Sequence, residues 1–97
     1  MEIAHPELLE TRAQLFKALS HPSRLYIVEL LAKGPRCVCD ITGHVGVDIS
    51  TVSKHLSVLK NAGVVTDAKN GNMVFYSLRM PCVLSFFRCI DDNASRG

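Results

Sequence analysis

The stretch that decides the fold is CVCDITGHVGVDISTVSKHLSVLKNAG, which runs from Cys37 to Gly63. Two features lie together in it. One is a Cys-x-Cys pair, Cys37 and Cys39, and the other is a pattern of two helices separated by a glycine. We therefore expect a pair of thiols beside a helix-turn-helix, and we expect the state of the thiols to control that element.

The two helices have clear boundaries in the sequence. The first is short and covers about residues 37–45, and Gly46 supplies the turn that follows it. The second has Asp48 as a good N-cap and ends at Gly63, a residue typical of helix C-termini.

The second helix divides into two faces at 100° per residue. Its apolar side carries Ile49, Val52, Leu56 and Leu59. Its polar side carries hydroxyls, an amide and a cation but no carboxylate, with members Ser50, Lys54, Ser57 and Asn61, Ser53 at the edge, and Thr51 and His55 on the flank. These groups suit phosphates and base edges of DNA better than they suit an ordinary solvated face. His55 fits a DNA contact and a partly buried polar side chain equally well.

Two further helices are expected upstream. Residues 6–19 have Pro6 at the first helical position and an apolar face formed by Leu8, Leu15, Phe16 and Leu19. The next helix runs from Pro22 to about Lys33 and ends at Gly34 and Pro35. Its apolar residues indicate the centre of the core: Leu25, Ile27, Val28, Leu30 and Leu31.

Downstream, Asn70-Gly71 between two runs of strand-forming residues is a strong hairpin signal, and Lys69 places a positive charge near the hairpin tip. Pro81 then opens a last, very apolar helix over residues 81–90, on which Cys82, Phe86 and Cys89 share one stripe. So apolar a helix at the end of a small domain suggests a surface for a partner.

Composition limits the class of protein. The chain of 97 residues fits one domain, residues 1–97, whose core is modest, so a dimer interface would help it. Its formal net charge of +2 permits nucleic-acid binding without arguing for it. No apolar run is long enough to span a membrane, and the N-terminus lacks the apolar core of a signal peptide. We expect a cytoplasmic protein, whose four cysteines are thiols or ligands rather than structural disulfides.

The Cys37–Cys39 pair is suited to a thiophilic ion, because thiolates are soft ligands. On an ideal helix, residues i and i+2 point about 200° apart, so the pair could share an ion only if the start of the helix bends or unwinds. Such bending would turn ligand binding into a switch. Arg36 and the helix N-terminus should lower a nearby thiol pKa. Two small packing residues are the alternative, and His44 nearby fits a solvated side chain better than a ligand.

Cys82 and Cys89 lie about 10.5 Å apart along their helix, too far for one disulfide or one shared ion within it. They could instead meet cysteines of another chain across a two-fold interface. Cys89 is the better candidate for a ligand because it lies deeper in the helix than Cys82. Burial as ordinary packing residues is the alternative.

The chain resembles the ArsR/SmtB family of metalloregulatory repressors from about Leu15 to Leu78. The resemblance rests on LSHPSRLYIVELL, CVCDI, STVSKHLSVLKNAGVV and NGNMVFYSL, and CVCD is similar to the arsenic-sensing branch in particular. It implies a mainly α winged helix-turn-helix with a β-hairpin wing, in the order ααααββα. It also implies a homodimer formed by the first and last helices, and a repressor that leaves DNA when a thiophilic ion binds.

One departure from the arsenic branch matters. There a third cysteine often follows the pair by three positions, where this chain has Thr42. A three-sulfur site would therefore need a thiolate from elsewhere.

Our leading hypothesis is a repressor that contacts operator DNA through Ser50, Thr51, Ser53, Lys54, His55 and Lys69. It is released by As(III) or Sb(III), or by Cd²⁺, Pb²⁺ or Zn²⁺, bound to Cys37, Cys39 and Cys89, with Cys82 the less favoured third ligand. One alternative replaces the ion by thiol oxidation or persulfide formation. Another is a metal-carrying or dithiol redox protein without DNA. The sequence shows no set of catalytic residues.

Overall fold

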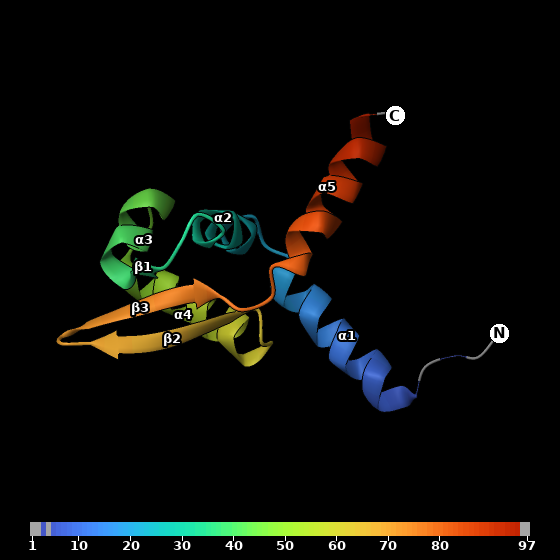
Figure 1. The fold of residues 1–97 in the computed structure, drawn as a ribbon, viewed down its shortest axis with the longest axis horizontal. Coiled ribbons are helices and arrows are strands. Elements are labelled where there is room, and N and C mark those ends of the chain that lie inside the picture. The colour runs from blue at the N-terminus through green and yellow to red at the C-terminus, as the bar shows by residue number, and fades with distance from the viewer. Residues whose placement is uncertain (1–2, 4, 96–97) are drawn as a thin grey trace.

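The computed structural model describes residues 3 and 5–95. Within this part of the chain, helices pack beside one small sheet whose hairpin projects outward (Figure 1). The elements follow in the order α1 (Pro6–Leu19), α2 (Pro22–Leu31), β1 (Arg36–Cys37), α3 (Val38–Val45), α4 (Ile49–Asn61), β2 (Val65–Asn70), β3 (Met73–Leu78) and α5 (Cys82–Ser95). The predicted helix-turn-helix and hairpin are confirmed.

The turn between α3 and α4 is set by its local sequence. Gly46 has φ 81°, a left-handed conformation that costs glycine little, and its N–H bonds back to the carbonyl of Thr42. The side chain of Asp48 then accepts the backbone N–H of Thr51 and so caps α4, as predicted. These two residues fix where α4 starts and therefore which of its side chains face outward.

The core lies between α2, α3, α4 and the sheet. Ile27 and Val28 of α2, Ile41 of α3, and Val52 and Leu56 of α4 are fully buried in it. Two expected core residues lie elsewhere. Leu25 is partly exposed in a groove beside α5, and Ile49 is 57% exposed because it stands at the first position of α4, beyond the packed part of the helix.

The sheet has three strands in the order β1–β3–β2, all antiparallel. Asn70 pairs with Met73 at the tip of the β2–β3 hairpin, as the Asn-Gly signal predicts. The two-residue strand β1 was not predicted, because it is too short to show alternation. Its Arg36 and Cys37 pair with Tyr76 and Phe75 of β3.

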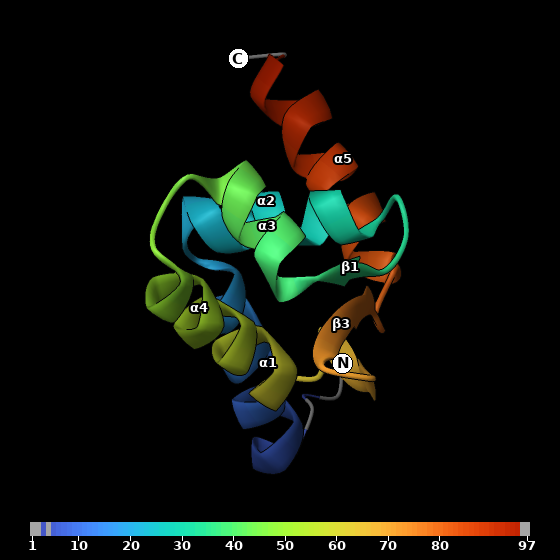
Figure 2. The ribbon, with the colours of Figure 1, turned by 90° about the vertical axis from the view of Figure 1, so that its left-hand side faces the viewer.

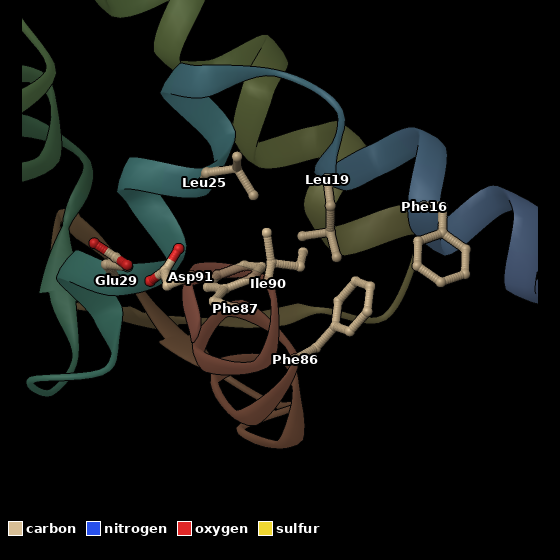
Figure 3. Close-up of a pocket in the computed structure, with 8 residues that line it drawn as sticks. All are labelled: Phe16, Leu19, Leu25, Glu29, Phe86, Phe87, Ile90 and Asp91. Carbon is tan, nitrogen blue, oxygen red and sulfur yellow. The ribbon is translucent and has the colours of Figure 1, made fainter. Parts of the chain in front are cut away.

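Helices α1 and α5 extend from the end of the molecule opposite the hairpin tip (Figure 1). The last helix is longer than expected, since it continues past Ile90 to Ser95. Between α1, α2 and α5 lies a mostly apolar groove of about 420 Å³ (Figure 3), in which the rings of Phe16 and Phe86 meet edge to face with centroids 5.5 Å apart. Both phenylalanines keep much of their surface exposed.

Candidate DNA interface and thiol pair

The polar side of α4 lies on the surface, next to the hairpin. Ser50, Ser53 and Lys54 are exposed, while Thr51 and His55 on the flank are half-buried. Lys69 is exposed near the hairpin tip. Figure 2 shows α4 to the lower left of α3 and the hairpin to its lower right. The candidate DNA contacts of α4 are thus accessible at the surface, and Lys69 lies on the adjacent hairpin.

An ion pair helps to hold the hairpin against α4. Lys60, in the last turn of α4, contacts the carboxylate of Asp67 in β2, with Nζ and Oδ2 3.0 Å apart. Helix α4 also packs directly on β2. The position of the hairpin relative to α4 is therefore fixed by contacts at the C-terminal end of this helix.

The carboxylate of Asp48 gathers the polar groups of the first turn of α4. Its Oδ1 accepts the Thr51 hydroxyl at 2.6 Å, and its Oδ2 accepts both the Ser50 hydroxyl and the Thr51 N–H, the latter at 3.2 Å. These hydrogen bonds lower the pKa of Asp48 to about 2, the Ser50 hydroxyl contributing most. Asp48 is therefore a carboxylate at every ordinary pH.

His55 is tied to the first two helices rather than standing free. Its Nδ1 lies 3.3 Å from Nη1 of Arg24, and its ring lies 4.5 Å from the ring of His21, centroid to centroid. Arg24 also donates from Nε to the carbonyl of Ala18 at 2.6 Å, at the C-terminal end of α1. Arg24 thus joins α1, α2 and α4. This leaves the predicted DNA contact of His55 as a prediction, with a structural role beside it.

The structure corrects our expectation for the thiol pair. Cys37 lies in β1 and is the extended N-cap of α3, so the helix begins only at Val38. The i, i+2 geometry of a helix therefore does not apply, and the sulfur atoms of Cys37 and Cys39 are 2.9 Å apart with the helix intact. No bending or unwinding of α3 is needed to bring the sulfurs together.

The two thiols differ in acidity. The pKa of Cys37 is lowered, mainly because the Cys39 thiol hydrogen-bonds to its sulfur and also because the backbone N–H of Asp40 donates to it at 3.3 Å. The pKa of Cys39 is raised, mainly by the same thiol–thiol hydrogen bond. Cys37 is the first of the pair to become a thiolate, and the thiolate is the form that binds soft ions.

Charged groups surround the pair. Arg36 and Asp40 form an ion pair with Nη1 and Oδ2 2.7 Å apart, and His44 lies with Nε2 3.7 Å from Oδ1 of Asp40. Cys82 and Cys89 are exposed and free on α5. Within the described residues, no group of three or more His, Cys, Asp or Glu side chains is placed to hold a metal ion. The described part of one protomer therefore presents a two-sulfur site, and the third ligand that we expect from α5 stays a prediction.

Two functional features were missed from the sequence. Nothing local marks Arg24 as a link between three helices, because its partners come from other helices. The hydrogen bonds from two hydroxyls to Asp48 could have been predicted from the sequence. Ser50 and Thr51 follow an N-cap aspartate at the spacing of an Asx-type cap.

Comparison with known proteins places the chain in a family. A sequence model described as bacterial regulatory protein, arsR family, matches residues 21–67. A relative from Synechocystis sp., named transcriptional repressor SmtB homolog, is 33% identical over 92 residues, covering 95% of this chain and 70% of the relative. The chain belongs to the ArsR/SmtB family. The members of this family are transcriptional regulators and not enzymes.

Other relatives of this ArsR-family chain include named regulators. The uncharacterised HTH-type transcriptional regulator Rv0081 of Mycobacterium tuberculosis is 40% identical over 75 residues, which are 76% of this chain and 66% of that protein. The cadmium resistance regulatory protein CadC homolog of Staphylococcus aureus is 42% identical over 67 residues, 68% of this chain and 55% of the relative. The chain thus spans just under two thirds of the first relative and about half of the second.

Solved structures agree on the fold. The homodimeric winged helix-turn-helix DNA-binding domain of Mb0332 from Mycobacterium bovis matches with a TM-score of 0.81 at 31% identity, over 98% of this chain and 91% of that one. A structure described as a possible transcriptional regulator for arsenical resistance matches with a TM-score of 0.66 at 35% identity, over 82% and 81%. This chain has the winged helix-turn-helix fold of the ArsR family. In the described residues, no helix is long and apolar enough to cross a membrane.

Proposed function

We propose that this protein is a dimeric repressor that holds operator DNA through α4 and the hairpin, and releases it when a thiophilic ion binds Cys37 and Cys39. The observation that carries the proposal is the 2.9 Å separation of the two sulfur atoms at the start of the helix-turn-helix. As(III) is our first choice of ion, because a preassembled pair of thiols offers it two soft ligands at once.

The names of relatives support a metal or metalloid as inducer. One relative is named for cadmium resistance and one neighbouring structure for arsenical resistance. Sb(III), Cd²⁺ and Pb²⁺ are soft enough to replace As(III), and Zn²⁺ also binds thiolates. The proposal places the protein in the cytoplasm, where reducing conditions keep thiols free.

The position of Cys37 gives the ion a route to both DNA-binding elements. Its backbone pairs with Phe75 in the hairpin strand β3, and its sulfur caps α3, which packs against α4. An ion bound to this sulfur competes with the Asp40 N–H for its lone pairs, so ligand binding weakens the cap at the start of α3. Because α3 and β3 are both joined to Cys37, such a change reaches α4 and the hairpin together.

We propose that the third ligand is Cys89 of the partner subunit, with Cys82 or a small thiol as the alternatives. A ligand from the partner is supported by the described residues of one protomer, which hold no group of three or more His, Cys, Asp or Glu side chains placed for a metal ion. Cys89→Ser is expected to weaken As(III) binding if Cys89 is this ligand, and Cys82→Ser if Cys82 is. A full response in both variants and in the double variant assigns the position to a small thiol or water.

The alternative trigger is thiol oxidation or persulfide formation at the same pair, favoured by the lowered pKa of Cys37. Titration of the reduced protein with As(III), Cd²⁺ and Zn²⁺ separates the two. A thiolate–metal absorbance band that rises to a stoichiometric end point, together with loss of operator binding, supports the ion. Loss of operator binding only after treatment with an oxidant or a persulfide donor supports the alternative.

A further inference from the structure

The hydroxyl groups of Ser50 and Thr51 have fixed hydrogen-bonding roles. Each hydroxyl has one hydrogen to donate and two lone pairs to accept with. Both hydrogens are donated to the carboxylate of Asp48, by Ser50 to Oδ2 and by Thr51 to Oδ1. Toward a partner, the oxygens of Ser50 and Thr51 can therefore only accept hydrogen bonds.

This arrangement disfavours a phosphate contact through the hydroxyls of Ser50 and Thr51. Phosphate oxygens accept hydrogen bonds and carry negative charge, so they find no donor in these two hydroxyls and are repelled by Asp48. Helix N-termini often bind phosphate through free backbone N–H groups. Here the Thr51 N–H is already bonded to Asp48. The first turn of α4 therefore offers a phosphate neither the two hydroxyl hydrogens nor the Thr51 N–H.

Base edges in the major groove offer what these oxygens need. The hydrogen-bond donors there are the amino groups of adenine N6 and cytosine N4, whereas guanine and thymine present acceptors. Recognition helices of the helix-turn-helix type contact bases with their N-terminal residues. Ser50 is exposed and Thr51 half-exposed, so both can reach such a partner.

We infer that Ser50 and Thr51 select operator positions carrying an adenine or cytosine amino group, and that Asp48 is the positioning residue that turns their oxygens into acceptors. This inference rests on the proposed contact of α4 with DNA, and it goes beyond that proposal by naming the chemistry of the bases that the first turn of α4 reads.

The test begins with selection of the preferred duplex from a random library by the full-length protein. Each selected adenine is then replaced by purine and each selected cytosine by 2-pyrimidinone, which removes the amino group alone. We expect loss of the amino group to weaken wild-type binding about two- to tenfold at one or two positions per half-site, the size of one neutral hydrogen bond. Equal binding of every amino-deleted duplex would overturn the inference.

Variants assign the effect to the hydroxyls. Ser50→Ala and Thr51→Val are each expected to abolish the difference between one natural base and its amino-deleted analogue. Ser85→Ala is the matched control, because Ser85 is an exposed serine on α5, outside the proposed DNA contacts. It should leave that discrimination unchanged. Discrimination that survives both Ser50→Ala and Thr51→Val overturns the assignment.

The variant Asp48→Asn separates the role of Asp48 in orienting the two hydroxyls from its role in capping α4. Asparagine caps helices as well as aspartate does, so the fold should survive. Its amide has one acceptor oxygen where the carboxylate has two, which frees one hydroxyl to donate. We expect selection with this variant to admit guanine or thymine at a position where the wild type requires an amino group. An unchanged preference refutes the role of Asp48, and loss of discrimination in this variant alone shows that the carboxylate itself contacts the base.

The same variants distinguish failure of this inference from failure of the proposed contact between α4 and DNA. If Ser50→Ala, Thr51→Val, Ser53→Ala and Lys54→Ala all bind the selected duplex as the wild type does, α4 does not contact DNA. If Lys54→Ala weakens binding while the amino-deleted duplexes bind like the natural one, α4 contacts DNA but the inference about amino groups is wrong.

Discussion

Lys54 supplies positive charge on the exposed face of α4, between the hydroxyls of Ser53 and Ser57 along the chain. If it contacts a phosphate, Lys54→Ala should weaken operator binding and reduce the slope of log K against log salt by about one, because one fewer counterion is released. Fluorescence anisotropy over a series of salt concentrations measures both. Lys33→Ala, beside α5, is the control and should change neither. An unchanged slope for Lys54→Ala would remove this residue from the interface.

The thiols of Cys37 and Cys39 should titrate in a fixed order. Cys37 has a lowered pKa and Cys39 a raised one, because the Cys39 thiol donates to the Cys37 sulfur. We expect iodoacetamide to modify Cys37 at lower pH than Cys39, as followed by mass spectrometry of the reduced protein. Cys39→Ala should raise the pKa of Cys37, since the largest cause of its lowering is removed. Modification of both thiols with one common pH profile would contradict the asymmetric hydrogen bond.

At the scale of elements, the junction of α1, α2 and α4 should respond to pH through His55. Its pKa is lowered, first by burial and then by the positive charges of His21 and Arg24. The folded state therefore binds a proton at His55 more weakly than the unfolded state, whose pKa is about 6.5. The resulting stability is present above about pH 6.5 and is lost as the pH falls toward the lower folded pKa.

Urea unfolding between pH 8 and pH 5 measures this effect. The free energy of unfolding should fall with pH in the wild type and fall less in His55→Gln. Ser57→Ala, an exposed residue of the same helix without a titratable side chain, is the control and should keep the wild-type dependence. Identical profiles for His55→Gln and the wild type would show that His55 contributes nothing to the pH dependence.

For the whole molecule, the groove between α1 and α5 predicts how two copies associate. Phe16 and Phe86 meet there with exposed faces, in continuity with Leu25 and Ile90 (Figure 3). A homodimer through α1 and α5 would cover these rings and hold two α4 helices roughly 34 Å apart, the spacing of successive major grooves.

Phe86→Glu should therefore give monomers in sedimentation at micromolar concentration and should weaken operator binding, because one half-site is then bound at a time. Met73→Glu, an exposed apolar residue of the hairpin, should stay dimeric. A wild-type protein that sediments as a monomer while it binds DNA would contradict this arrangement.

The parts of the fold that sequence alone predicts are those with local causes. Gly46 permits a left-handed turn, Asp48 caps a helix and Asn70-Gly71 forms a hairpin through contacts with near neighbours. Cys37 was misplaced because its strand exists only through pairing with Phe75, far along the chain. Arg24 likewise acts through partners on other helices.

The candidate site likewise has some features that the sequence predicts and others that depend on the folded chain. The two cysteines could be named from the sequence, but their shared geometry follows from a strand that only the folded chain contains. The polar residues of α4 followed from helical periodicity. The fixed direction of the Ser50 and Thr51 hydroxyls is a property of three-dimensional hydrogen bonds to Asp48, which periodicity does not describe.

The most direct test of the central claim is release of operator DNA by As(III) from the reduced wild-type protein and from Cys37→Ser and Cys39→Ser. Serine fills nearly the space of cysteine but is a poor ligand for soft ions, so both variants should bind operator as the wild type does. We predict that As(III) lowers operator affinity of the wild type by about 5- to 150-fold, the usual range of coupling between two sites, and leaves both variants unchanged. A full response to As(III) in both variants would contradict the account.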